Sequence, residues 1–192
     1  MQTKIILVSH ALTDWNMQGK IQGHRDVPLN NIGRKMAYQL AEHLRHFVID
    51  RIYCSDLIRT VQTAEPTAAL KHLSIFRDMR LREGRSIDQN MQGEYPVLAF
   101  YQDFETEEDV LKRMSEVLAE IAINESGKQV LVVSHAKAME LFIQDLLLKQ
   151  AKDPGLYLGK RSALNFLQFS AGQWEIQALN QADYLEQLRL NC

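Results

Sequence analysis

KIILVSH at residues 4–10 and QVLVVSH at residues 129–135 are the two stretches of this sequence that decide its fold class. Each is a continuous apolar run, rich in β-branched residues, that ends in Ser-His. Runs of this kind are typical of strands that are buried on both faces of a parallel sheet. The sequence therefore predicts an α/β protein with these two strands inside its sheet.

The segments around these strands alternate between strand and helix patterns. Residues 11–33 hold three glycines, Pro28 and several polar residues, and we expect a long functional loop there. The other predicted elements are a helix of about four turns from Gly33, a strand at 51–55, a helix after Asp56 that Pro66 ends or kinks, a short strand within 74–82, a helix at about 110–121 behind the acidic run 105–109, a helix at 137–149, and a hairpin at 162–179 turning at Ala171-Gly172. We predict a single domain over residues 1–192, a three-layer α/β/α sandwich whose mostly parallel sheet carries antiparallel edge strands.

Composition and charge narrow the class of protein. The 192 residues are 46% apolar and 24% charged, as in an ordinary soluble domain large enough to fold without a disulfide or a metal. The 22 Lys and Arg against 24 Asp and Glu give a net charge of −2, so neither nucleic acid nor a membrane is expected as a partner. Cys54 and Cys192 are the only cysteines, and no apolar run is long enough for a signal peptide or a membrane span. We therefore expect a cytoplasmic protein. The sequence leaves open whether it is a monomer or a homodimer.

Two histidines occupy matching positions at the ends of the two buried strands. His10 lies in Leu7-Val8-Ser9-His10-Ala11 and His135 in Val132-Val133-Ser134-His135-Ala136. Ligands of open α/β sheets bind outside the carboxyl ends of the strands, so the two imidazoles face one pocket if the strands are neighbours. A lone histidine at a strand end is more often structural, but the matched pair favours a functional site.

A third strand end adds a cation to this candidate site. Ser55 ends the strand at 51–55, and Arg59 follows four residues later in the first turn of the next helix. A helix N-terminus already favours anions, and arginine adds a bidentate clamp that is always charged. A surface salt bridge is the alternative role for Arg59, but the accompanying histidines favour a phosphate site.

Five segments of the chain follow one another in the order of a known set of motifs. They are SHALTDWN (9–16) for R-H-G-E-T-x-W-N, QGHRDVPL (22–29) with Gly33 for Q-G-x-x-D-x-P-L-x-x-x-G, SDLIRTVQTAEP (55–66) for S-D-L-x-R-x-x-Q-T-A-E-P, Leu81-Arg82-Glu83 for L-x-E, and Ser134-His135-Ala136 for S-H-G. With these, nearly the whole chain resembles the histidine phosphatase superfamily, the phosphoglycerate mutase-like clan. The resemblance implies a phosphoglycerate mutase-like fold.

The resemblance also implies a role for each matching residue. His10 would be the nucleophile that takes the phosphoryl group, Arg59 and His135 would hold its oxygens, and Glu83 would be the general acid for the leaving alcohol. The other residues implied to bind the phosphate are Ser9, Asn16, Gln22, Gly23 and Ala136. Asp88 and Glu94 stay open as alternative acids. No metal or cofactor is implied, because positioning and charge stabilisation carry phosphoryl transfer.

The first motif departs from the family at its first position, where Ser9 stands in place of arginine. Serine offers one neutral donor on a short stem, and loss of one oriented donor costs about 10²- to 10³-fold in rate. Arg25 or Lys137 are candidates to supply the missing charge. Ala11 and Ala136 also replace glycines, and their methyl groups would crowd a backbone that approaches phosphate closely.

We therefore expect a phosphomonoesterase of the histidine acid phosphatase type, acting on a small phosphorylated molecule through a phosphohistidine on His10. Ser9 predicts that it is slow or specialised. The alternative is a pseudophosphatase that binds a phosphate ligand or a protein. A mutase is less expected, since the chain has no counterpart of the longer substrate-handling insert of the glycolytic mutases. A two-histidine metal site is disfavoured because no third ligand has the usual spacing.

Overall fold

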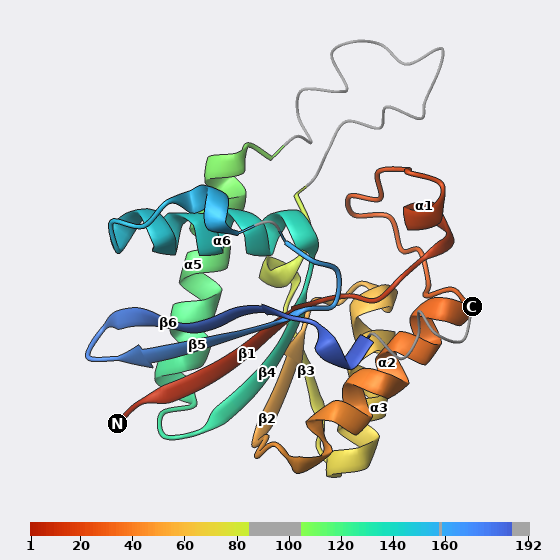
Figure 1. Cartoon of the computed structure of the whole chain (residues 1–192), viewed down its shortest axis with the longest axis horizontal. Coiled ribbons are helices and arrows are strands. Elements are labelled where there is room, and N and C mark those ends of the chain that lie inside the picture. Colours follow the sequence, from red (N-terminus) through yellow and green to blue (C-terminus); the bar gives the residue numbers. More distant parts are fainter. Residues whose placement is uncertain (85–104, 158, 186–192) are drawn as a thin grey trace.

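A six-stranded sheet in the order β3-β2-β4-β1-β5-β6 forms the middle layer of the protein (Figure 1). The computed structural model describes residues 1–84, 105–157 and 159–185. The strands are β1 (Thr3–Ser9), β2 (Arg51–Cys54), β3 (Ile75–Arg77), β4 (Gln129–Ser134), β5 (Leu164–Ser170) and β6 (Gln173–Gln181). The helices are α1 (Asp14–Met17), α2 (Asn31–His43), α3 (Ile58–Lys71), α5 (Glu107–Asn124) and α6 (Ala136–Lys149), with 3-10 turns η1 (Leu44–His46), η2 (Met79–Leu81), η3 (Pro154–Leu156) and η4 (Asp183–Leu185).

Helices cover both faces of the sheet, as predicted. Alternate residues of β1 point to opposite faces, so Ile5 and Leu7 pack with α5 and α6 while Ile6 and Val8 pack with α2 and α3. Figure 1 shows the two helix pairs on opposite sides of the strands. The three-layer α/β/α architecture is confirmed.

The pairing of β1 with β4 at the centre of the sheet is parallel and extends from Lys4↔Gln129 to Ser9↔Ser134. β2 and β3 continue the parallel part beyond β4, whereas β5 pairs with β1 in the antiparallel sense and β6 pairs with β5. The predicted mostly parallel sheet with antiparallel edge strands is therefore confirmed. The two Ser-His sequences end on the same edge of the sheet.

Some local predictions are confirmed and others are corrected. The hairpin β5–β6 turns at Ala171 and Gly172, whose φ angles of 49° and 77° are those of a type I′ turn. The loop at 11–33 contains the short helix α1, which begins at a capping box formed by Thr13 and Asn16. The short strand expected within 74–82 occupies only Ile75–Arg77, followed by η2.

Pro66 does not end its helix, contrary to one of the two outcomes expected from it. α3 continues to Lys71 and is closed by His72, whose φ of 55° is left-handed. Ala64 and Ala68, on either side of Pro66, are buried in the core between α3 and the sheet. Their burial continues the apolar face of α3 across the proline, and most helical stability in proteins comes from such packing.

Asp88, Glu94 and Cys192, which figure in the sequence analysis, lie outside the described residues. Within the described ranges, no helix has the length and apolar character needed to cross a membrane.

The loop after β1 is held against α2 by a close backbone approach at Gly33. The carbonyl of Leu12 accepts the Asn30 N–H at 3.0 Å, and Asn30 caps α2 by accepting the Gly33 N–H at 2.8 Å. A Cβ on Gly33 would lie 2.0 Å from the Leu12 oxygen. No side chain fits there, so glycine fixes how close the loop comes to the helix.

Replacing Gly33 by alanine is therefore expected to destabilise the fold, although alanine is the better helix former. Gly33→Ala should lower the free energy of unfolding in urea by about 1–3 kcal/mol, the usual cost of overpacking. Lys35→Ala, an exposed change in the same helix, should stay within about 0.5 kcal/mol of wild type. A Gly33→Ala protein as stable as wild type would show that the loop is not fixed at this contact.

Candidate active site

The two histidines meet where the sequence predicts. His10 directly follows β1, His135 is the N-cap residue of α6, and their ring centroids lie 5.3 Å apart in an edge-on arrangement. The backbone N–H of His10 donates to the backbone carbonyl of Ser134 at 2.9 Å, and this bond ties the two strand ends together. The parallel register thus builds a paired-imidazole site.

Hydrogen bonding fixes which nitrogen of His10 is available for chemistry. Nδ1 lies 2.7 Å from the Ala11 carbonyl oxygen, which can only accept, so Nδ1 carries the proton. Nε2 then has the free lone pair. Burial, helped by the charge of Arg59, lowers the pKa of His10 to about 3. The ring is therefore neutral and nucleophilic at cellular pH.

Arg59 is a fully buried cation whose hydrogen-bond partners are neutral. Its Nη1 and Nη2 donate to the carbonyls of Arg25 (2.7 Å) and Gly23 (2.8 Å), and its Nε is buried without a partner. Burial lowers the pKa of Arg59 to about 10, so it stays charged at neutral pH. Within the described residues no carboxylate forms an ion pair with it, and buried charges are normally paired. The site therefore favours an anionic ligand.

The other polar residues of the α3 motif hold the site together. The Oγ of Ser55 lies 2.8 Å from Nε2 of His135 and 2.9 Å from Oγ1 of Thr60. Further along the helix, Thr63 accepts the Ala11 N–H at 3.0 Å. Burial places the pKa of His135 well below its ordinary value, so its ring is neutral at neutral pH.

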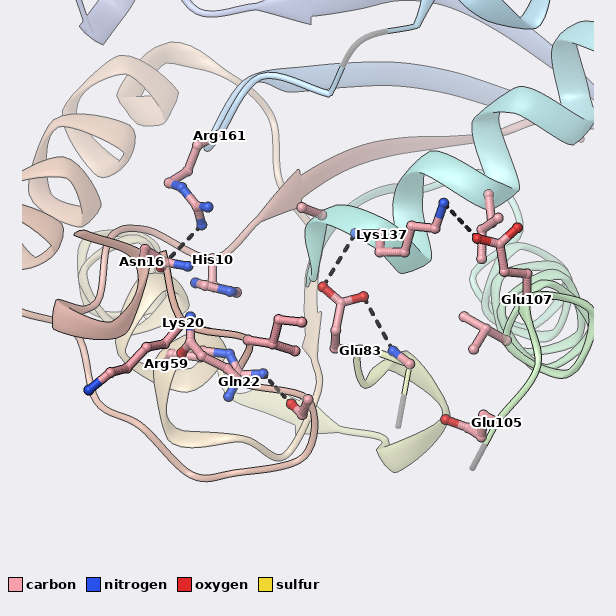
Figure 2. A pocket seen from close by; sticks show the side chains of 16 residues that line it. His10, Asn16, Lys20, Gln22, Arg59, Glu83, Glu105, Glu107, Lys137 and Arg161 are labelled. Carbon is pink, nitrogen blue, oxygen red and sulfur yellow. Dashed lines mark hydrogen bonds and ion pairs between the residues drawn. The ribbon is translucent and has the colours of Figure 1, made fainter. Parts of the chain in front are cut away.

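Glu83 lies across the pocket from His10 with its carboxylate at the N-terminus of α6 (Figure 2). It accepts the N–H groups of Ala138 (3.0 Å) and Lys137 (3.3 Å). Burial nevertheless raises the pKa of Glu83 above its ordinary value, which favours a protonated carboxyl. Arg113 donates to the Glu83 carbonyl at 3.0 Å and fixes the backbone. A carboxyl held in this way can act as a proton donor.

The structure brings most of the predicted residues around one pocket of about 340 Å³. Those that line it are His10, Asn16, Gln22, Gly23, Arg59, Glu83 and Ala136. His135 packs behind His10, outside the lining. Asn16 Oδ1 accepts from Thr13 and Arg161, which leaves the amide nitrogen of Asn16 as a donor toward the pocket.

Ser9 and the two candidate replacement cations, Arg25 and Lys137, contact other groups of the protein. The Ser9 Oγ does not line the pocket, because it accepts the Ser162 N–H at 3.0 Å. The Arg25 guanidinium lies over the ring of Trp15, 5.3 Å from its centroid. Lys137 lines the pocket, but its ammonium pairs with Glu107 at 2.8 Å.

Arg161 is a cation of the pocket that the sequence analysis missed. It precedes β5, lines the pocket and donates from Nη1 to Asn16 Oδ1 at 3.2 Å (Figure 2). No motif includes it. The only signal in the sequence is its place just before an apolar strand, which becomes informative once β5 is known to pair with β1.

No metal site accompanies these residues in the described parts of the chain, where no three His, Cys, Asp or Glu side chains gather to hold an ion.

Comparisons with known proteins show what the whole chain is similar to. A family model described as "Histidine phosphatase superfamily (branch 1)" matches residues 5–182. An uncharacterized phosphatase of Bacillus subtilis, PhoE, is 31% identical over 187 residues, which cover 93% of this chain and 94% of PhoE. Phosphoserine phosphatase 1 of Hydrogenobacter thermophilus is 32% identical over 160 residues, 75% of this chain and 76% of its own length.

Solved structures of the same fold extend the comparison. YhfR of Bacillus stearothermophilus matches with a TM-score of 0.80 at 23% identity, over 95% of this chain and 99% of YhfR. A phosphoglycerate mutase of Bacillus anthracis matches with a TM-score of 0.80 at 18% identity, over 98% of this chain and 97% of the mutase. The fold is therefore phosphoglycerate mutase-like, as predicted.

The buried neutral histidines make stability depend on pH. Above about pH 6.5, His10 is neutral in both the folded and the unfolded chain. Below that, the unfolded chain binds a proton that the folded protein, with a pKa of about 3, does not bind, so the free energy of unfolding falls as pH falls. His10 alone should lower the free energy of unfolding by about 2 kcal/mol between pH 7 and pH 5.

Urea unfolding of the ligand-free protein at pH 7 and pH 5 checks this expectation. The decrease should be about 2 kcal/mol smaller in His10→Gln than in wild type. In His46→Gln, a change at an exposed histidine of η1, the free energy of unfolding should decrease between pH 7 and pH 5 by the same amount as in wild type. An equal decrease in wild type and His10→Gln would contradict the buried neutral state of His10.

Proposed function

The chain belongs to the histidine phosphatase superfamily, and from that premise we propose that it is a phosphomonoesterase that forms a phosphohistidine on His10. The observation that carries the proposal is the combination of His10 and Arg59. A neutral imidazole with a free Nε2 shares a pocket with a buried guanidinium that has no carboxylate partner among the described residues. The first is a nucleophile and the second a place for phosphate oxygens.

In the first step, Nε2 of His10 attacks the phosphorus of a bound monoester. The new N–P bond forms as the bond from phosphorus to the leaving oxygen breaks, and the leaving oxygen takes the proton of the Glu83 carboxyl. Arg59 stabilises the charge on the phosphoryl oxygens. The raised pKa of Glu83 supports this assignment, because the acid must be protonated when the substrate binds.

In the second step, water attacks the phosphorus of the phosphohistidine. The Glu83 carboxylate takes a proton from that water, the N–P bond breaks, and inorganic phosphate leaves with His10 neutral again. The same carboxyl group thus gives a proton in one step and recovers one in the next. Splitting the reaction replaces one difficult displacement by two easier ones.

The proposed substrate class is small phosphorylated molecules. The pocket volume of about 340 Å³ is at the lower end of the range for small-molecule sites. One relative is named as a phosphoserine phosphatase, which is consistent with a substrate of that size. The alternative function is a phosphate-binding module without turnover, and the placement of Ser9 outside the pocket is the observation that favours it.

Hydrolysis of 4-nitrophenyl phosphate tests the proposal. Wild type should release phosphate, and His10→Ala should lose at least about 10⁴-fold in kcat, because the nucleophile is gone. His46→Ala, outside the pocket, should match wild type. Turnover that survives in His10→Ala would contradict the phosphohistidine, whereas phosphate binding without turnover in wild type would establish the binding module.

A further inference from the structure

The segment just before β5, one of the two strands that neighbour β1, carries a second guanidinium to the site. β5 runs antiparallel to β1, and their pairing reaches Leu7↔Asn165. The residues just before β5 therefore lie next to the residues that end β1, and the Ser162 N–H donates to the Ser9 Oγ at 3.0 Å. This contact places Arg161, the next residue back along the chain, beside His10.

We propose that Arg161 holds phosphate oxygens opposite Arg59, and that it replaces the cation that position 9 lacks. The inference rests on the proposed function, since it assigns a further residue to the same phosphate site. Ser9 then has a role of its own as a positioning residue, because its hydroxyl anchors the segment that presents Arg161.

The hydrogen bonding of Arg161 leaves its guanidinium available to a ligand. Within the described residues, its only hydrogen bond runs from Nη1 to Asn16 Oδ1. A guanidinium has five N–H donors in a planar fork, so donors remain for two phosphate oxygens. The bond to Asn16 also orients the fork, and Figure 2 shows the side chain directed toward Asn16 and His10.

The electrostatics of the pocket favour a dianion between the two arginines. Arg59 is buried and Arg161 is half-buried, and the positive charge of each lowers the pKa of His10. Neither forms an ion pair with a carboxylate in the described residues. The charge of Glu83 acts favourably on both arginines, whereas Arg161 acts unfavourably on Arg59. A phosphate monoester carries about two negative charges at neutral pH, which would neutralise both cations.

The other cations near the pocket are engaged elsewhere. The Lys137 ammonium pairs with Glu107 at 2.8 Å, and the Lys20 ammonium lies over the Trp15 ring, 5.8 Å from its centroid. Arg25 lies over the same ring and contributes its carbonyl, not its guanidinium, to Arg59. Arg161 is therefore the cation best placed to act with Arg59.

Two measurements test the proposal: the binding of inorganic phosphate by calorimetry and the kcat/KM for 4-nitrophenyl phosphate. Arg161→Gln should weaken phosphate binding at least about tenfold and lower kcat/KM by about 10²- to 10³-fold, as for loss of an oriented donor. The phosphate affinity and kcat/KM of Arg161→Lys should lie between those of wild type and Arg161→Gln, because lysine keeps the charge but lacks the planar fork of N–H donors. Lys160→Gln, which removes an exposed charge one residue away, should match wild type.

The double variant Ser9→Arg/Arg161→Gln tests the exchange of position. Returning a guanidinium to the end of β1 should recover at least about tenfold of the phosphate affinity lost in Arg161→Gln. Circular dichroism and urea unfolding establish that each variant is folded. A folded double variant that binds phosphate no better than Arg161→Gln would overturn the replacement of one cation by the other.

The outcomes separate this proposal from the proposed function. If His10→Ala is inactive but Arg161→Gln binds phosphate and turns over as wild type does, the phosphatase stands and the role of Arg161 is overturned. If wild type shows no hydrolysis, the phosphatase fails. Phosphate binding still decides the role of Arg161, since weaker binding by Arg161→Gln supports it and unchanged binding overturns it.

Discussion

The parallel pairing of β1 with β4 is the constraint on which the site depends. Its register sets Ser9 opposite Ser134, so the residues that follow both serines emerge together at one edge of the sheet. The strands are held in this register by apolar side chains buried on both faces, and a slip by one residue would exchange those faces. His10 and His135 are buried and neutral as a consequence, and the core supplies the stability that such burial costs.

The helix α3 is mainly a scaffold for the site, with a single cation directed into it. Thr60 contacts Ser55, which precedes the helix and in turn contacts His135. Thr63 holds the backbone after His10, and Gln62 accepts the Leu29 N–H at 2.9 Å. Arg59 is the motif residue that reaches the pocket. The dense polar sequence of this helix is therefore explained by the need to fix a long loop and two imidazoles around one guanidinium.

The sequence was sufficient for the elements whose causes are local. The continuous apolar runs predicted the buried parallel strands, the twin Ser-His ends predicted the paired histidines, and Ala171-Gly172 predicted the turn of the hairpin. The continuation of α3 through Pro66 could not be predicted locally, because it depends on packing against the sheet. Arg161 escaped prediction for a related reason: its place beside His10 follows from the antiparallel pairing of β5 with β1, which brings together residues about 150 positions apart in the chain.

The proposed function depends on phosphoryl transfer through Nε2 of His10, with Glu83 as the proton carrier. Trapping the intermediate in Glu83→Gln tests it most directly. 4-Nitrophenolate leaves without a proton, so the first step should proceed in this variant while the attack of water is slowed. Acid-free quenching and peptide mapping should locate a phosphoryl group on His10. A phosphoryl group on another residue, or turnover by wild type with no label on His10 in either protein, would contradict the account.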